Sequence, residues 1–226
     1  MPVFRTYPAQ LRKPMAQSKI CGLSTPEAVA RALEGGAAYI GFIFFPKSPR
    51  NITADAAARL ANPARGKAKL VAVTVDASDA DIDSIANTLK PDFIQLHGRE
   101  TPNRAAEIRA RTGVGVIKAI PVSSASDIDA AARFDGAADH LMFETKAPAD
   151  AVLPGGNGVA FDWPLLNGRR FSRPWFLAGG LDPWNVEEAV RASGAPLVDV
   201  SSGVERGPGL KDPDLISAFL NAVRRA

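Results

Sequence analysis

The sequence predicts an α/β protein that folds as a single-domain (β/α)8 barrel, the TIM-barrel architecture, and three features lead to this prediction. Short apolar or β-branched runs alternate with alanine-rich amphipathic stretches along the chain. Strands that are separated by helices pair in parallel through right-handed crossovers. Most of the runs are continuously apolar, as in parallel strands that are buried on both faces. Eight strand-then-helix units within residues 18–226 fit a compact barrel, with an open doubly wound sheet as the alternative.

The units follow one another without a linker that could separate two domains. Strands are expected, in chain order, at 19–21, 39–44, 69–75, 93–96, 114–120, 140–143, 175–178 and 197–200. Amphipathic stretches predict helices at 26–34, 54–61, 80–89, 102–111, 125–134, 183–192 and 213–225. A long Gly/Pro loop and a short turn near Trp163 follow the sixth strand. Four helices are expected to begin at a capping residue followed by proline, namely at Thr25-Pro26, Thr101-Pro102, Asp182-Pro183 and Asp212-Pro213.

The composition of the 226-residue chain excludes several classes of protein. Hydrophobic residues make up 46% and charged residues 23%, as in a folded domain with a large core. The lone cysteine excludes an internal disulfide framework and suits a reducing compartment, so a cytoplasmic location is expected. No apolar run is long enough to span a bilayer. The formal charge of +3 is too small to indicate nucleic acid and is compatible with a small anionic ligand.

The first 17 residues are predicted to form a flexible or loosely docked extension before the catalytic barrel at 18–226. They contain three basic residues and no acidic residue, a composition that is also found in transit peptides. Prolines at positions 2, 8 and 14 disrupt an amphipathic helix, and no apolar segment resembles the core of a secretion signal. A targeting segment is therefore the less favoured alternative.

Two strand ends offer groups for acid-base chemistry. Cys21 ends the first expected strand, and active sites of such barrels lie at the carboxyl ends of the strands. Taken alone, a single cysteine is more often a small buried apolar residue. Glu144 ends the sixth strand, where it could form a salt bridge with Lys146 or serve as the acid opposite a Cys21 base. The second role requires an ionised thiol and a protonated carboxyl group at the same pH.

Glycine- and serine-rich turns follow the last three strands and indicate a bound phosphate. They occur at 155–158, 178–181 and 200–203. Glycine lets backbone N–H groups converge on an anion, and barrels of this kind commonly bind phosphate at the loops after strands seven and eight. Each turn alone could be an ordinary tight turn, but three at consecutive strand ends favour a phosphorylated small-molecule substrate.

Three further residues at strand ends are candidates for binding. Arg50 could grip a carboxylate with its guanidinium or lie solvated on the surface. Asp199 interrupts an apolar strand, where it faces a polar ligand group or caps neighbouring backbone. His97 could be a general acid or base, but a hydrogen-bonded positioning role is preferred. Two histidines and one cysteine, far apart in the sequence, offer no metal-ligand cluster, so no metal is expected.

Several short motifs occur in order over residues 18–226. They are Lys-Ile-Cys-Gly-Leu at 19–23, Ile-Gly-Phe-Ile-Phe at 40–44, Ser-Pro-Arg at 48–50, Gln-Leu-His-Gly at 95–98, Pro-Gly-Gly-Asn-Gly at 154–158, Phe-Asp-Trp at 161–163, Ala-Gly-Gly-Leu at 178–181, Asn-Val at 185–186, Asp-Val-Ser-Ser-Gly-Val-Glu at 199–205 and Pro-Gly-Leu-Lys-Asp at 208–212. Together they resemble the motifs of the phosphoribosylanthranilate isomerase family of tryptophan biosynthesis. The segments at 19–23 and 199–205 are the most specific part of this resemblance.

The resemblance implies an Amadori rearrangement of N-(5-phosphoribosyl)anthranilate to 1-(2-carboxyphenylamino)-1-deoxyribulose 5-phosphate, without a cofactor or metal. By position, Cys21 is expected to be the base that removes the proton from ribose C2, and Glu144 the acid that protonates the ring oxygen. Arg50 is expected to hold the anthranilate carboxylate and Asp199 to orient the amino side, with His97 also among the substrate-binding residues. The expected lining of the phosphate site is Gly156, Gly158, Gly179, Gly180, Ser201, Ser202 and Gly203.

The chain departs from the family pattern at two motif positions and in its N-terminal extension, and two other functions stay open. The family usually has aspartate where this chain has Glu144, and it tends to have Phe, an apolar residue and Asn where this chain has Thr-Val-Asp at 74–76. Another phosphosugar isomerase or epimerase is one alternative, although the histidine-pathway isomerases of this fold rely on two aspartates rather than a cysteine. The other is a barrel that binds phosphoribosyl compounds without turnover. A monomer or homodimer is expected, with neither nucleic acid nor a membrane as partner.

Overall fold

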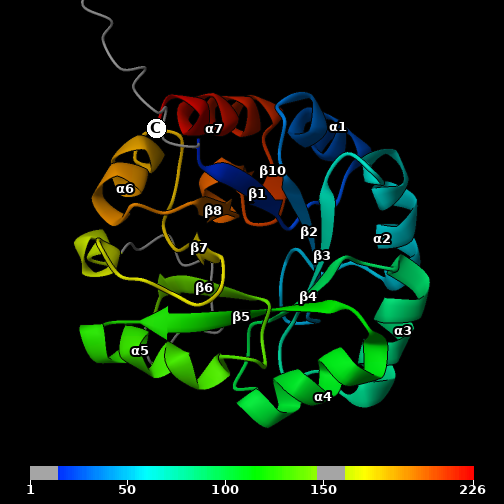
Figure 1. Cartoon of the computed structure of the whole chain (residues 1–226). Helices are drawn as coiled ribbons and strands as arrows, with labels where there is room; N and C mark the ends of the chain where they lie inside the picture. The colour runs from blue at the N-terminus through cyan, green and yellow to red at the C-terminus, as the bar shows by residue number, and fades with distance from the viewer. Residues whose placement is uncertain (1–14, 147–160) are drawn as a thin grey trace, which may run out of the picture.

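The computed structural model describes residues 15–146 and 161–226 of the chain. Within these residues eight parallel strands close into a barrel, and the last strand pairs with the first. In chain order they are β1 (Gln17–Cys21), β2 (Tyr39–Phe44), β3 (Lys69–Thr74), β4 (Phe93–Leu96), β5 (Gly115–Val122), β6 (His140–Thr145), β7 (Trp175–Leu177) and β8 (Leu197–Val200). Helices surround the barrel on its outside (Figure 1). The predicted (β/α)8 barrel is confirmed, and the doubly wound alternative is wrong.

The described part of the chain contains seven α-helices, and six of them begin within one residue of their predicted starts. They are α1 (Pro26–Glu34), α2 (Ala54–Ala61), α3 (Asp79–Leu89), α4 (Pro102–Thr112), α5 (Ala125–Asp129), α6 (Val186–Ser193) and α7 (Pro213–Arg225). The helix predicted at 125–134 is divided into α5 and a 3₁₀-helix, η2 (Ala130–Phe134). Between β6 and β7, the described residues form the short 3₁₀-helix η3 (Trp163–Leu166), which confirms the short turn predicted near Trp163.

Helix capping confirms three of the four predicted helix starts. Side-chain oxygens accept hydrogen bonds from first-turn N–H groups at Thr25, Thr101 and Asp212. The fourth prediction is wrong, because α6 has Asn185 as its N-cap. The Asp182 carboxylate instead accepts hydrogen bonds from the N–H groups of Trp184 and Asn185. This closes a turn in front of the helix, which therefore starts three residues later than predicted.

Side chains along each strand alternate between the barrel interior and the surrounding helices. On β1, Ile20 packs in the large core between strands and helices, while Cys21 belongs to the smaller core inside the barrel. Lys19, two residues before Cys21, faces inward as well. Polar side chains on the inner face therefore converge toward the carboxyl ends of the strands.

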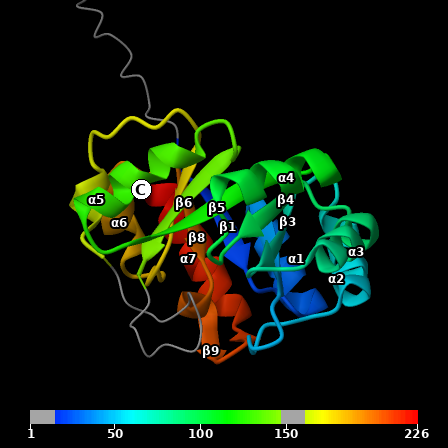
Figure 2. The same ribbon diagram turned by 90° about the horizontal axis from the view of Figure 1, so that it is seen from below.

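A short antiparallel hairpin that the sequence did not indicate follows β8. After the 3₁₀-helix η4 (Ser202–Val204), it consists of β9 (Glu205–Gly207) and β10 (Leu210–Lys211). In Figure 2, β9 lies beyond the carboxyl ends of the barrel strands, at the bottom of the view. The hairpin thereby brings Glu205 and Lys211 to the same end of the barrel as Cys21.

The predicted extension and the barrel meet at β1. This strand begins at Gln17, so the last residue assigned to the extension is already paired with β8. Residues 1–14 of the extension lie outside the described residues. Among the helices of residues 15–146 and 161–226, none has the length and apolar character needed to cross a membrane.

Candidate active site

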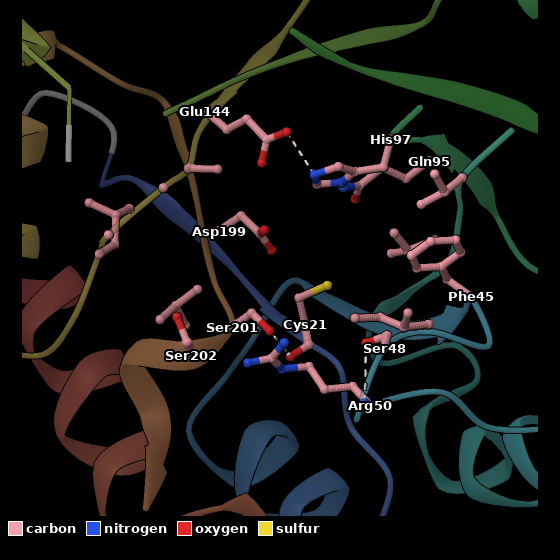
Figure 3. Close-up of a pocket in the computed structure, with 18 residues that line it drawn as sticks. Cys21, Phe45, Ser48, Arg50, Gln95, His97, Glu144, Asp199, Ser201 and Ser202 are labelled. Atoms are coloured by element: carbon pink, nitrogen blue, oxygen red, sulfur yellow. Dashed lines mark hydrogen bonds and ion pairs between the residues drawn. The ribbon is translucent and has the colours of Figure 1, made fainter. Parts of the chain in front are cut away.

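A pocket opens at the carboxyl ends of the strands (Figure 3). Its lining contains nine of the twelve predicted site residues, namely Cys21, Arg50, His97, Glu144, Gly179, Gly180, Asp199, Ser201 and Ser202. Gly203 is not among the lining residues. Gly156 and Gly158 lie outside the described residues. Residues from six different strand ends are therefore brought together as the barrel geometry predicts.

Cys21 occupies the last position of β1 and is buried. Burial raises the pKa of its thiol, and the Lys19 ammonium only partly opposes that rise. The Lys19 side chain is fully buried, and its Nζ donates a hydrogen bond to Asp199 Oδ1 at 2.9 Å. The acid within the apolar strand β8 is thus paired with a buried cation, and it also faces the pocket.

His97 and Glu144 form the second polar pair of the pocket. His97 Nε2 lies 2.7 Å from Glu144 Oε1 (dashed line in Figure 3). Burial works against the imidazolium, but the Glu144 carboxylate outweighs it and raises the pKa of His97. On the other side of the ring, Gln95 Nε2 lies 2.9 Å from His97 Nδ1. Glu144 therefore contacts His97, and a salt bridge between Glu144 and Lys146 is not found among the described residues.

Arg50 is buried rather than solvated, so the surface alternative for this residue is wrong. Its Nε and Nη2 donate hydrogen bonds to the two carboxylate oxygens of Glu205, at 2.7 and 2.8 Å. Lys211 Nζ donates to the same carboxylate at 2.6 Å. Burial raises the pKa of Glu205, but these two cations outweigh burial and hold the pKa below its usual value. Two cations surround one carboxylate, so the cluster keeps a net positive charge beside the pocket.

An apolar wall lies on the Arg50 side of the pocket. It is formed at the ends of β2 and β3 by Ile43, Phe45, Val73 and Val75. Such a surface suits a flat aromatic ring, and the neighbouring guanidinium suits a carboxylate on that ring. The wall and Arg50 together can therefore hold an aromatic carboxylate.

The turns after β7 and β8 line the opposite part of the pocket and pack closely against each other. Gly179 and Gly180 both have positive φ, at 86° and 68°, a conformation that favours glycine. A Cβ at Gly203 would lie 1.9 Å from the carbonyl oxygen of Leu181, so only glycine allows the two turns to approach this closely. Gly203 thus supports the pocket from behind, while Ser201 and Ser202 face it.

Several residues of the site were not singled out as candidates from the sequence. Lys19 and Gln95 precede Cys21 and His97 by two residues, and strand alternation alone would have placed each pair on one face. Glu205 and Lys211 reach the site through the β9–β10 hairpin, which no clear pattern in the sequence indicated. Among the described residues, no group of three or more His, Cys, Asp or Glu side chains is arranged to hold a metal ion.

The chain is similar to proteins of one enzyme family. Residues 18–222 match the family model described as N-(5'phosphoribosyl)anthranilate (PRA) isomerase. The N-(5'-phosphoribosyl)anthranilate isomerase of Caulobacter vibrioides is 66% identical over 210 residues, which cover 92% of this chain and 96% of that protein.

Solved structures show the same similarity. The phosphoribosyl anthranilate isomerase of Thermotoga maritima has a TM-score of 0.84 and 34% identity, covering 94% of this chain and all of that chain (100%). A phosphoribosyl anthranilate isomerase in complex with reduced 1-(o-carboxyphenylamino)-1-deoxyribulose 5-phosphate has a TM-score of 0.79 and 31% identity, with coverages of 94% and 100%.

Proposed function

The chain belongs to the N-(5'-phosphoribosyl)anthranilate isomerase family, and on this basis we propose that it catalyses the Amadori rearrangement of N-(5-phosphoribosyl)anthranilate in tryptophan biosynthesis. The product is 1-(2-carboxyphenylamino)-1-deoxyribulose 5-phosphate, so an aldose derivative becomes a ketose derivative. One observation carries the proposal: Cys21 and Glu144 share a pocket with Arg50, an apolar wall and the Gly/Ser turns. The substrate carries the matching groups, an aromatic carboxylate, a ribose and a phosphate.

The two ends of the substrate are proposed to bind at the two sides of the pocket. The anthranilate ring lies against the apolar wall, and its carboxylate accepts hydrogen bonds from Arg50. Glu205 uses two of the five N–H groups of the guanidinium, so three can serve the ligand. The phosphate accepts hydrogen bonds from the turns at 179–180 and 201–202, and Gly156 and Gly158 are proposed to belong to the same site.

Glu144 is proposed to start the reaction as the general acid. It protonates the ribose ring oxygen, and the C1–O bond breaks as the nitrogen lone pair forms a C1=N bond. His97, at 2.7 Å, keeps the carboxyl group in place and exchanges a proton with it. A positioned general acid typically accelerates such a step by about 10²–10⁴-fold.

Cys21 is proposed to complete the rearrangement as the general base. Its thiolate removes the proton from C2, and the electron pair of the C–H bond forms the C1=C2 bond while the nitrogen becomes neutral. The resulting enol-amine tautomerises to the ketone. Asp199 faces the same pocket and is proposed to orient the amino side of anthranilate. These steps need only side chains of the pocket and no cofactor.

The test is turnover of N-(5-phosphoribosyl)anthranilate, followed by the loss of its fluorescence. The wild-type chain is expected to consume the substrate, and Cys21→Ala to lower kcat by about 10²–10⁴-fold because the base is removed. Unchanged turnover in Cys21→Ala would show that another group is the base. A wild-type chain that binds the substrate without consuming it would favour the binding protein over the isomerase.

A further inference from the structure

Lys19 is a buried cation that the proposed reaction does not use. It is one of the largest side chains that are fully buried among the described residues, at 0% exposure. A buried ammonium is costly unless it is paired, and Asp199 Oδ1 lies 2.9 Å from its Nζ. One acceptor does not use all three ammonium hydrogens. The role of Lys19 therefore depends on which groups surround the remaining ammonium hydrogens.

The second neighbour of the Lys19 ammonium is the Cys21 thiol. Both side chains come from the inner face of β1, two residues apart. Gly41, which pairs with Cys21 across β1 and β2, has no side chain that could separate them. A Cβ at Gly41 would lie 3.0 Å from Cys21 Sγ and 3.2 Å from Lys19 Nζ. Sulfur and ammonium thus border the same small gap inside the barrel.

The charges around the thiol act in opposite directions. Burial raises the pKa of Cys21, and among the charged groups Lys19 has the largest effect, which lowers it. Asp199 raises the thiol pKa, and Lys211 lowers it to a smaller extent. Arg50, His97 and Glu144 face the same pocket from the ends of β2, β4 and β6. Lys19 is therefore the group best placed to favour the thiolate in a site whose burial disfavours it.

We propose that Lys19 is a positioning residue whose ammonium, held between Asp199 and Cys21, stabilises the Cys21 thiolate inside the barrel. The proposal rests on the proposed function, because a thiolate is required only if Cys21 is the base. When Cys21 takes the proton from C2, the thiolate charge disappears and the ammonium keeps Asp199 as its partner. The Lys19 ammonium therefore contacts both Asp199 and the sulfur when the thiol is ionised, and it stays paired with Asp199 when the thiol is protonated.

The experiment measures the ionisation of Cys21 directly, without substrate. Because the chain contains one cysteine, alkylation by iodoacetamide followed by mass spectrometry reports on Cys21 alone. The alkylation rate is measured against pH for the wild type, Lys19→Met and Lys19→Arg. Lys19→Met is expected to raise the midpoint by at least about one pH unit, which is about a tenfold smaller thiolate fraction near neutral pH. Lys19→Arg keeps the charge and is expected to stay close to the wild type.

A double variant separates this role from a purely structural one. Lys19→Met alone leaves Asp199 buried without its cation, whereas Lys19→Met with Asp199→Asn leaves no unpaired charge. Because Lys19 affects the thiol more than Asp199 does, the double variant is also expected to have a raised midpoint. If the double variant titrates as the wild type does, Lys19 serves only as the partner of Asp199 and the proposal is wrong. The double variant decides the question if Lys19→Met does not fold.

A second buried lysine provides the matched control. Lys118 on β5 is also buried, but its ammonium donates to the carbonyl oxygens of Leu96 and Gly98 and to Glu100. Lys118→Met is expected to leave the thiol midpoint unchanged, and an equal shift there would overturn the assignment to Lys19.

Turnover of the same variants is measured separately. The limb of the kcat profile that depends on thiolate is expected to move with the alkylation midpoint. If the wild type fails to turn over while the midpoints shift as expected, the isomerase proposal fails and the coupling of Lys19 to Cys21 stands.

Discussion

Glu205 holds Arg50 through both carboxylate oxygens, with Nε donating to Oε1 at 2.7 Å and Nη2 donating to Oε2 at 2.8 Å. Lys211 donates to the same carboxylate and to the carbonyl oxygen of Ser201, at 2.6 and 2.7 Å. A buried chain of charged groups thus connects the residue proposed to bind the anthranilate carboxylate with the turn proposed to bind the phosphate. The geometry of the end proposed to bind the carboxylate therefore depends on the geometry of the end proposed to bind the phosphate.

Replacing Arg50 is expected to weaken substrate binding more than it slows the chemical step. A hydrogen-bonded carboxylate interacts similarly in the ground state and the transition state, so Arg50→Ala is expected to raise KM by about 10–100-fold, with a smaller loss of kcat. Steady-state kinetics of the fluorescence assay measure both constants. Arg99→Ala is the matched control, because that side chain is 97% exposed. A loss confined to kcat would contradict a binding role for Arg50.

Removing the charge of Glu205 tests whether the ion pair orients Arg50. Glu205→Gln leaves two buried cations without their carboxylate, so it is expected to raise KM as Arg50→Ala does and to lower the free energy of unfolding by roughly 3–5 kcal/mol. Because the pKa of Glu205 is lowered, its stabilising contribution is present above its ordinary value of 4.5 and is lost as the pH falls through the lowered value. Urea unfolding at several pH values measures it. If Glu205→Gln has the same KM as Arg99→Ala, Glu205 has no part in substrate binding.

The length of the acid side chain is expected to matter at position 144. Glu144→Gln removes the proton donor and is expected to lower kcat by about 10²–10⁴-fold with little change in KM. Glu144→Asp withdraws the carboxyl group from His97, and a displacement near 1 Å can cost up to about 100-fold in rate. Single-turnover measurements on the three proteins separate chemistry from binding. An Asp variant as fast as the wild type would show that either acid fits, and full activity of the Gln variant would assign the acid to another residue.

The strand ends could be read from the sequence because a parallel barrel places every carboxyl end on one rim. From this rule alone, Cys21, Glu144 and Asp199 are expected at one site, although they lie on three strands far apart in the chain. All three line the same pocket. Strand alternation also predicts that Lys19 shares the inner face with Cys21, since it lies two residues before Cys21. Periodicity therefore predicts which side chains share a face and an end.

The partners of the polar residues could not be predicted, because they depend on where separate loops meet. Arg50 and Glu205 are 155 positions apart, and they meet only because the β9–β10 hairpin turns back over the barrel. The start of α6 was predicted three residues too early for a different, local reason, because the Asp182 side chain can cap a turn as readily as a helix. Sequence propensity shows which conformations and partners are open to each residue, and the contacts made in the folded chain decide which of them occurs.

The contact between His97 and Glu144 is expected to make the stability of the protein depend on pH. Burial lowers the pKa of His97, but the Glu144 carboxylate outweighs burial and raises the pKa above its ordinary value of 6.5. Lys19 lowers it and Asp199 raises it to smaller extents. A raised pKa stabilises the fold fully below 6.5, and this contribution is lost as the pH rises through the higher folded-state value. The loss amounts to about 1.4 kcal/mol for each unit by which the pKa is raised.

Urea unfolding of the wild type and of His97→Gln between about pH 5.5 and 8.5 measures this contribution as the difference between the two proteins. The difference is expected to be largest at low pH and to shrink as the pH rises. The other histidine, His140, has its pKa lowered by burial, so it acts in the opposite direction, but it is present in both proteins and cancels. Glu144→Gln keeps His97 and removes the carboxylate, so it is expected to lose the same pH dependence. A difference that grows with pH would mean that the folded protein favours the neutral imidazole, and His97 could then not supply a proton to Glu144.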